Sequence, residues 1–197
     1  MRVVQTSLPG VVIVEPDVHR DARGYFLEVF HAGKFAAAGL PTSFVQDNHS
    51  ASVKNTLRGL HFQRTKPQGK LVRAVEGEIW DVAVDVRPGS PTFGQWTATT
   101  LSAENFRQLY VPPGFAHGFC VLSETAQVQY KCTAFYEPAD EAGIIYNDPS
   151  QQQVINFQDA QAFVWSQEYL AGNVFSAGAT GPGFFKDRKS TRLNSSH

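Results

Sequence analysis

Residues 79–86 read IWDVAVDV, and this stretch decides the fold class. Every second residue from Trp80 to Val86 is apolar, whereas Asp81 and Asp85 fall at alternate positions. A period of two is the pattern of a β-strand, because successive side chains of a strand point to opposite faces. These residues are therefore predicted to form a strand with its apolar side chains on one face and its aspartates on the other.

The same alternation recurs along most of the chain, from Val3 to about Ala134. EGE at 76–78 and RPGSP at 87–91 supply turns on either side of that strand, and QWTATTL at 95–101 then alternates again. Strands that follow one another at short intervals favour an all-β sandwich or barrel over alternating strands and helices. We therefore expect an all-β jelly-roll barrel, the class of double-sheet fold that includes the cupins.

A few short helices complete the expected fold. HAGKFAAAG at residues 31–39 holds a run of alanines, which favour helix, and its last residue, Gly39, can cap a helix before Pro41. A second, shorter helix is predicted near residues 166–170. Because no repeat or linker divides the chain, residues 1–187 are expected to form a single domain.

The last ten residues differ from the rest of the chain. RKSTRLNSSH at 188–197 is polar, carries three cations and has no hydrophobic period. It resembles translated vector or adaptor sequence. We expect a non-native or disordered tail and leave it out of the fold.

Composition narrows the class of protein. A net charge of −1, with 18% charged residues, offers no basic face for nucleic acid. No stretch approaches the roughly 20 apolar residues of a membrane span, and MRVVQTSLPG lacks the apolar run of a signal peptide. Cys120 and Cys132 offer neither a disulfide framework nor a paired zinc spacing. We expect a soluble, cytoplasmic protein without nucleic-acid or membrane partners.

Four polar clusters interrupt the β-rich pattern. They are DARGYFLE (21–28), VQDNHS (45–50), LRGLHFQ continuing to QGKLV (57–72), and PPGFAHGF leading to VQYKCT (112–133). A strand that turns Arg58 and His61 inward must find partners for them, since unpartnered polar groups are costly to bury. Side chains from several strands that point into the mouth of a small barrel make a natural ligand site.

Longer motifs carry a family resemblance over about residues 1–148. They are RGYFLE, FVQDNHS, LRGLHFQ, QGKLVRAVEGEIWDVAVDVRPGSPTFGQW, LSAENFRQLYVPPGFAHGFCVLSE and YKCTAFYEPADE. With these motifs the chain resembles the dTDP-4-dehydrorhamnose 3,5-epimerase family, the RmlC-like sugar nucleotide epimerases of cupin fold. The resemblance implies the same jelly-roll barrel.

The resemblance also implies a reaction. The substrate would be dTDP-4-dehydro-6-deoxy-D-glucose, whose hydrogens at carbons 3 and 5 flank a ketone and are acidic enough for a base to remove. Inversion then needs a base on one face of the sugar and an acid on the other, without a cofactor. His61 matches the family's proton-abstracting histidine, Tyr130 its proton donor, and Lys70 a residue placed to stabilise the enolate. An isolated histidine would more often be a hydrogen-bonded core residue, but the other matching motifs favour the catalytic role.

Further residues fall at substrate-binding positions of the family. They are Arg23, Phe26, Glu28, Gln46, Asp47, Asn48, Arg58, His117 and Glu141. Members of the family are homodimers that exchange their amino-terminal strands, so Arg23 is expected to reach the site of the neighbouring subunit. Without the resemblance, Arg23 and Glu28 would be interpreted as ordinary surface charges.

A metal site is not expected. PPGFAHGF supplies His117 as a cupin-like ligand, but the first half of such a site normally offers two histidines two residues apart. Here His61 is followed by Gln63, so the usual ligand set cannot be assembled.

The match fails after about residue 148. The family ends in a serine, a variable residue, a lysine and the aspartate that orients the catalytic histidine, whereas here Ser166 leads to Glu168 and Tyr169 at the last two positions. Glu168 is a candidate replacement for the orienting group, and Asp159 is a more distant one.

The altered ending leaves four functions open. They are a 3,5-epimerase of L-rhamnose or deoxysugar synthesis, a 3-epimerase, a 3,4-ketoisomerase, and a sugar nucleotide-binding cupin without catalysis. Because both proton-transfer residues are present, the 3,5-epimerase is the main prediction.

Overall fold

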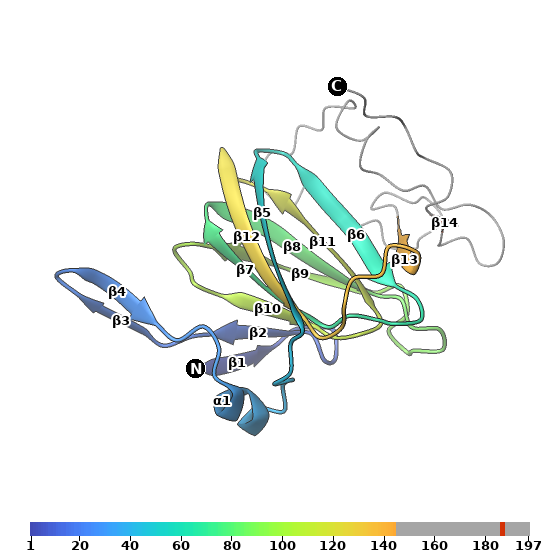
Figure 1. Cartoon of the computed structure of the whole chain (residues 1–197), viewed down its shortest axis with the longest axis horizontal. Coiled ribbons are helices and arrows are strands. Elements are labelled where there is room, and N and C mark those ends of the chain that lie inside the picture. The colour runs from blue at the N-terminus through green and yellow to red at the C-terminus, as the bar shows by residue number, and fades with distance from the viewer. Residues whose placement is uncertain (145–185, 188–197) are drawn as a thin grey trace.

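The computed structural model describes residues 1–144 and 186–187, and these residues confirm the predicted all-β jelly roll. Two six-stranded sheets face each other, and a two-stranded hairpin stands apart from both (Figure 1). Every described strand pair is antiparallel. Among the described strands none pairs from one large sheet to the other, so the arrangement is a sandwich rather than a closed barrel.

The first large sheet joins strands that are far apart in the sequence. In spatial order these are β1 (Arg2–Gln5), β2 (Val12–Glu15), β10 (Gln108–Val111), β7 (Lys70–Glu76), β12 (Thr125–Cys132) and β5 (Gln46–Val53). The neighbours β7, β12 and β5 bring three of the polar clusters into one sheet.

The second large sheet contains the strand predicted from IWDVAVDV. In spatial order its strands are β14 (Lys186–Asp187), β13 (Glu141–Gly143), β6 (Leu57–Gln63), β11 (Phe115–Val121), β8 (Glu78–Asp85) and β9 (Trp96–Ser102). β8 is the predicted strand, displaced by one residue at each end. The strand that carries the LRGLHFQ motif, β6, lies between β13 and β11.

Both faces of β8 are buried. Val82 packs in an apolar cluster on the outer face of this sheet, while Asp81 and Asp85 are fully buried at the alternate positions. Each aspartate has a charged or ionisable partner, His117 for Asp81 and Arg87 for Asp85. The alternation of the sequence predicted the two faces correctly, and these pairings explain how the polar face can be buried.

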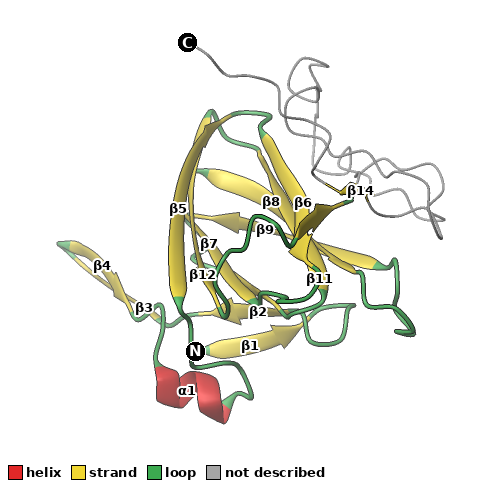
Figure 2. Ribbon diagram, turned by 45° about the vertical axis from the view of Figure 1, so that its right-hand side comes forward, coloured by secondary structure: helices red, strands yellow, loops and turns green. Residues whose placement is uncertain are grey.

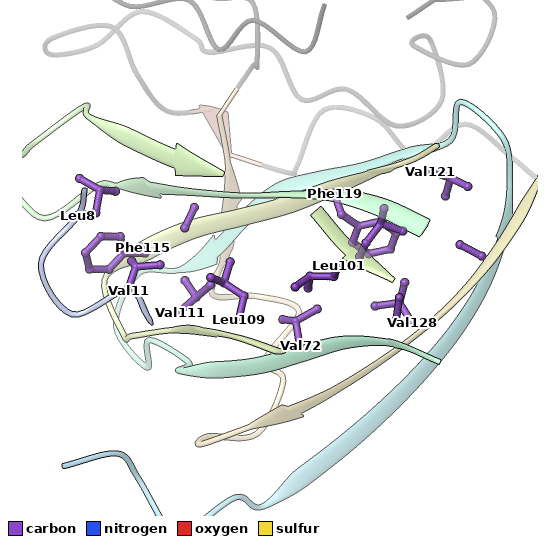
Figure 3. Close-up of a cluster of buried hydrophobic side chains, with 14 residues drawn as sticks. Leu8, Val11, Val72, Leu101, Leu109, Val111, Phe115, Phe119, Val121 and Val128 are labelled. Carbon is purple, nitrogen blue, oxygen red and sulfur yellow. The ribbon is translucent and has the colours of Figure 1, made fainter. Parts of the chain in front are cut away.

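The main core lies between the two sheets, as Figure 3 shows. Val72 and Val128 of the first sheet meet Leu101 and Phe119 of the second, and all four are almost fully buried. Burial of each such side chain contributes about 1.5–3 kcal/mol, so this cluster fixes the two sheets face to face. The inward positions of the same strands also hold the polar side chains of the candidate site.

The predicted helix at residues 31–39 is confirmed as α1 (Ala32–Ala37). Nδ1 of His31 accepts a hydrogen bond from the backbone N–H of Lys34, which caps the first turn. Phe35 is buried on the outer face of the first sheet, and Gly39 follows the helix with φ +72°, a conformation that glycine adopts without strain. The helix predicted near residues 166–170 and the tail at 188–197 lie outside the described residues.

The hairpin of β3 (Val18–Asp21) and β4 (Gly24–Leu27) projects away from the sandwich (Figures 1 and 2). Arg23 in its turn and Phe26 in β4 are exposed to solvent. Exposed large aromatic side chains on a projecting element are typical of a contact surface. Within the described residues, no helix is long and apolar enough to cross a membrane.

Asp85 organises the loop that follows β8. Its carboxylate accepts hydrogen bonds from the Arg87 guanidinium at 2.7 and 2.9 Å, and from the hydroxyls of Ser90 and Thr92 at 2.6 Å each. Burial by itself would raise the pKa of Asp85, but these hydrogen bonds outweigh burial and hold the pKa well below its usual range. The ionised carboxylate therefore stabilises the folded protein.

Replacing Asp85 by asparagine is expected to lower the free energy of unfolding at pH 7 by about 1–3 kcal/mol. Because the folded-state pKa of Asp85 is depressed, its contribution is present in full above the usual carboxyl pKa near 4 and is lost as the pH falls below it. Urea denaturation at pH 7 and at pH 3 should show the difference between wild type and D85N shrinking at the lower pH. E124Q, which removes an exposed partner of Lys54, serves as control with a change below about 0.5 kcal/mol. An equal difference at both pH values would contradict the prediction.

Candidate active site

A cavity of about 320 Å³ opens between strands of the two sheets. It is lined by Gln46, Asn48, His61, Phe62, Gln63, Gln68, Lys70, Tyr130, Tyr136 and Glu141. His61 comes from β6 of the second sheet, whereas Lys70 and Tyr130 come from β7 and β12 of the first. The three residues predicted to carry catalysis therefore meet in one cavity.

β6 holds His61 in place by close packing on both sides. Leu60 is buried in the outer apolar cluster, so the strand is anchored there while His61 faces the cavity with about a third of its side chain exposed. Gly59 has φ +126°, and a Cβ on it would lie 2.5 Å from Cα of Gly118 in β11. Only glycines allow this approach of β6 to β11, which explains the glycine of the LRGLHFQ motif.

A buried carboxylate lies beside His61. Oε1 of Glu141 is 3.5 Å from Nδ1 of His61, and Oε2 accepts a hydrogen bond of 2.5 Å from the Tyr136 hydroxyl. Glu141 is 7% exposed, whereas Tyr136 is 43% exposed at the edge of the cavity. The Glu141 carboxylate thus contacts both the imidazole of His61 and the hydroxyl of Tyr136.

His117 and Asp81 form a second pair of buried groups. His117 is the antiparallel neighbour of His61 across the β6–β11 pair. Its Nε2 lies 2.9 and 3.1 Å from the two carboxylate oxygens of Asp81 in β8, and both side chains are buried. This pair supports the cavity wall next to His61 and is not among the side chains that line the cavity.

Burial changes the proton affinity of two cavity residues. It lowers the pKa of Lys70, and the negative charges of Glu141 and Asp81 partly oppose that shift. It also raises the pKa of Tyr130, while the positive charge of Arg58 acts in the opposite direction. Tyr130 therefore keeps its phenolic proton at neutral pH, as a proton donor must.

Several predicted binding residues lie elsewhere. Arg58 is exposed and donates to the Ser52 hydroxyl at 2.9 Å. Asp47 points to the opposite face of β5 from Gln46 and Asn48, and it pairs with Lys131 at 2.9 Å. The remaining three, Arg23, Phe26 and Glu28, belong to the projecting hairpin and the segment after it, and none of them lines the cavity.

Asp47 and Lys131 border a separate hollow of about 260 Å³ on the outer face of the first sheet. His49, Arg73 and Gln129 line it as well. Because side chains alternate along β5, a residue between Gln46 and Asn48 cannot share their face. The sequence motif VQDNHS could not show which of its members face inward.

Gln63 occupies the position of the second cupin histidine. Its amide nitrogen donates to the carbonyl oxygens of Lys66 and Phe135, and its amide oxygen accepts from the backbone N–H of Glu137. Gln63 thus holds two loops at the cavity edge. In the described part of the chain, no three His, Cys, Asp or Glu side chains converge as metal ligands would.

Sequence reasoning missed the site contributions of Asp81 and Tyr136. Asp81 interrupts the apolar residues of IWDVAVDV, and a charge in a strand predicted to be buried signals a partner. Tyr136 gave no comparable signal, because AFYEPADE has no regular period. The predicted orienting residue Glu168 and its alternative Asp159 lie outside the described residues.

Comparison with known proteins decides the family. The sequence model of the family described as dTDP-4-dehydrorhamnose 3,5-epimerase matches residues 5–167. This chain belongs to the dTDP-4-dehydrorhamnose 3,5-epimerase family. The family assignment and the epimerase class predicted from the motifs are thereby confirmed.

Relatives in the 3,5-epimerase family cover most of the chain. The dTDP-4-dehydrorhamnose 3,5-epimerase of Methanothermobacter thermautotrophicus is 55% identical over 148 residues, which are 75% of this chain and 80% of that protein. The Salmonella typhimurium protein of the same name is 50% identical over 180 residues, or 86% of this chain and 98% of that protein.

A solved structure of the family matches in three dimensions as well. The Legionella pneumophila epimerase RmlC, in complex with dTDP-4-keto-L-rhamnose, is 50% identical with a TM-score of 0.73. The match covers 75% of this chain and 79% of that chain.

Replacing Lys70 by methionine is expected to raise the free energy of unfolding at pH 7 by about 1 kcal/mol, because a neutral side chain avoids the cost of burying an ammonium group. The pKa of Lys70 is lowered in the folded state, so wild-type stability should rise with pH toward the usual lysine value near 10.4. Urea denaturation at pH 7 and pH 9 should show the advantage of K70M shrinking at pH 9. In the control K131M, which loses a pair on the outer face, stability should change by less than about 1 kcal/mol. A K70M protein less stable than wild type at pH 7 would contradict the inference that burial of the Lys70 ammonium group lowers the free energy of unfolding.

Proposed function

We propose that this chain inverts carbons 3 and 5 of dTDP-4-dehydro-6-deoxy-D-glucose and gives dTDP-4-dehydro-L-rhamnose. The observation that carries the proposal is that His61 and Tyr130 come from opposite sheets and line one cavity together with Lys70. Inversion at a carbon requires a base and an acid on opposite faces of the sugar. Two facing sheets supply that arrangement.

His61 acts as the base. Its imidazole removes the proton from the carbon next to the ketone, and the electron pair moves onto the ketone oxygen to form an enolate. Tyr130 then donates its phenolic proton to the same carbon from the other face, which inverts the configuration. The raised pKa of Tyr130 keeps that proton available at neutral pH.

Lys70 stabilises the enolate. It lines the cavity, where burial lowers its pKa, and in its protonated form its ammonium group would offset the negative charge that develops on the ketone oxygen. Where bound substrate displaces water from the cavity, one such cation contributes more than it would in water. The overall reaction changes no oxidation state, so it needs no redox cofactor.

The cavity fits a sugar, and the nucleotide would extend from it. A volume of about 320 Å³ lies at the small end of the usual range of ligand pockets. Gln46, Asn48 and Glu141 supply polar groups on its wall. The Legionella relative was solved with a dTDP-linked keto sugar, which supports a dTDP-sugar as substrate. We place the enzyme in the cytoplasm, where nucleotide sugars are made.

The hairpin would complete the site of a second subunit. Arg23 and Phe26 are predicted to bind substrate, yet they lie on an arm that pairs with neither large sheet. The Arg23 side chain is 90% exposed and Phe26 is 70% exposed. A homodimer that exchanges this arm would bury both residues and bring them to the partner's cavity, as the sequence predicted.

Incubation with dTDP-4-dehydro-6-deoxy-D-glucose in deuterated water tests the reaction. Wild type is expected to place deuterium on carbons 3 and 5, as followed by NMR, and H61A should lose this exchange by at least about 100-fold. Y130F should still allow exchange but slow inversion, because its base remains in place. Exchange at carbon 3 alone would identify a 3-epimerase, and a shifted ketone would identify a ketoisomerase. Binding without exchange at either carbon would leave a sugar nucleotide-binding protein.

Mixing two inactive variants tests the exchanged arm. In a mixed dimer of R23A and H61A, one site combines the intact His61 of one subunit with the intact Arg23 of the other. If subunits mix at random, half of the dimers are mixed, and activity should recover to about a quarter of the wild-type value. Controls are each variant alone and a mixture of H61A with K70M, whose defects lie in the same cavity and cannot be rescued by an arm. Activity no higher than the sum of the two variants would rule out a shared site.

A further inference from the structure

We propose that Glu141 is a positioning residue for His61, held in place by the hydroxyl of Tyr136. From the family resemblance, Glu141 was predicted to bind substrate, and Glu168 was the candidate for the carboxylate that orients His61. The described residues instead place the Glu141 carboxylate beside the imidazole. This inference rests on the proposed function, in which His61 is the base.

Strand pairing puts the two residues on one face. Gln63 of β6 pairs with Glu141 of β13, and His61 pairs with Gly143 two residues along. Glu141 and His61 are therefore diagonal neighbours on the inward face of an antiparallel pair. A diagonal separation is within reach of long side chains, so the contact follows from the register of β6 and β13.

Burial and hydrogen bonding fix the Glu141 carboxylate. Glu141 is 7% exposed, and a carboxylate so buried needs partners to remain charged. The Tyr136 hydroxyl donates to Oε2 at 2.5 Å, which orients the group so that Oε1 faces Nδ1 of His61 at 3.5 Å. Tyr136 thereby fixes the orientation of the Glu141 carboxylate relative to His61.

The contact suits a base that becomes charged during the reaction. At 3.5 Å the two atoms are further apart than in a good hydrogen bond but within the range of an ion pair. When His61 takes the proton from the sugar, the imidazolium gains a carboxylate next to Nδ1. The same contact favours the tautomer of His61 with its proton on Nδ1.

Other charged and titratable groups surround His61 and must be considered with Glu141. From the strands and the loop packed around it these are Lys70, Tyr130, His117, Asp81, Arg58 and Tyr136. The cation of Lys70 disfavours a second positive charge on His61, whereas the Asp81 carboxylate is bound to His117. Glu141 thus brings a carboxylate into contact with the imidazole of His61.

The variant E141Q tests the inference by its pH profile. Glutamine keeps the size and hydrogen-bonding capacity of the side chain but removes the charge, so the pKa of His61 should fall by about one unit. The acid limb of kcat/KM, which reports the free enzyme, should move to lower pH by the same amount, and kcat should fall about 10- to 100-fold with KM nearly unchanged. Y136F should show a smaller change in the same direction.

E137Q is the matched control, because Glu137 lies on the same segment but is exposed and pairs with Lys66. It should leave the pH profile unchanged. A second readout, titration of the His61 ring by NMR without substrate, does not depend on activity and is made on E141Q and on Y136F. If E141Q does not fold, the NMR titration of His61 in Y136F tests the inference by itself.

Two outcomes would overturn the inference. One is a raised KM in E141Q with an unchanged acid limb and an unchanged His61 titration, which would show that Glu141 contacts substrate instead. The other is an unchanged His61 titration in Y136F where E141Q is unfolded. Absence of deuterium exchange in the wild-type enzyme would instead refute the proposed function, and the two failures are therefore distinguishable.

Discussion

The pairing of β6 with its two neighbours is the constraint on which the site depends. On one side, Gly59 and Gly118 allow β6 and β11 to approach more closely than any side chain would permit. On the other side, β13 pairs with β6 in the register that sets Glu141 diagonal to His61. A shift of either pair by one residue would turn His61 away from the cavity, because strand side chains alternate between faces.

The interior of the sandwich combines two kinds of environment. An apolar core of side chains from both sheets supplies the stability, and the inward positions of the same strands hold the cavity. Two pairs of polar groups lie there: Asp81 with His117, and Glu141 with Tyr136. Lys70 is the exception in energetic terms, because its burial disfavours the charge that the proposed reaction needs. In the proposed reaction, stability would be given up at Lys70 in favour of chemistry.

The projecting hairpin is the element on which the proposed dimer depends. β3 and β4 pair with each other and with no other described strand. An isolated two-stranded hairpin is marginally stable in water, and within the chain this arm packs through Tyr25 and Arg20 on Phe106, so a second surface over its exposed Phe26 would stabilise it further. In the proposed dimer, that surface is the partner's cavity, and binding of substrate and association of subunits depend on the same residues.

The sequence by itself determined the strands, the helix at residues 31–39, the jelly roll and the family, because these depend on local alternation, capping and motifs. It also predicted catalytic roles for His61, Lys70 and Tyr130, which line one cavity in the structure. Only the tertiary structure decided the neighbour of His61, the burial of Asp81 and the outward direction of Asp47. These features depend on the register between strands that are far apart in the chain, and local patterns contain no information about which distant residue stands opposite.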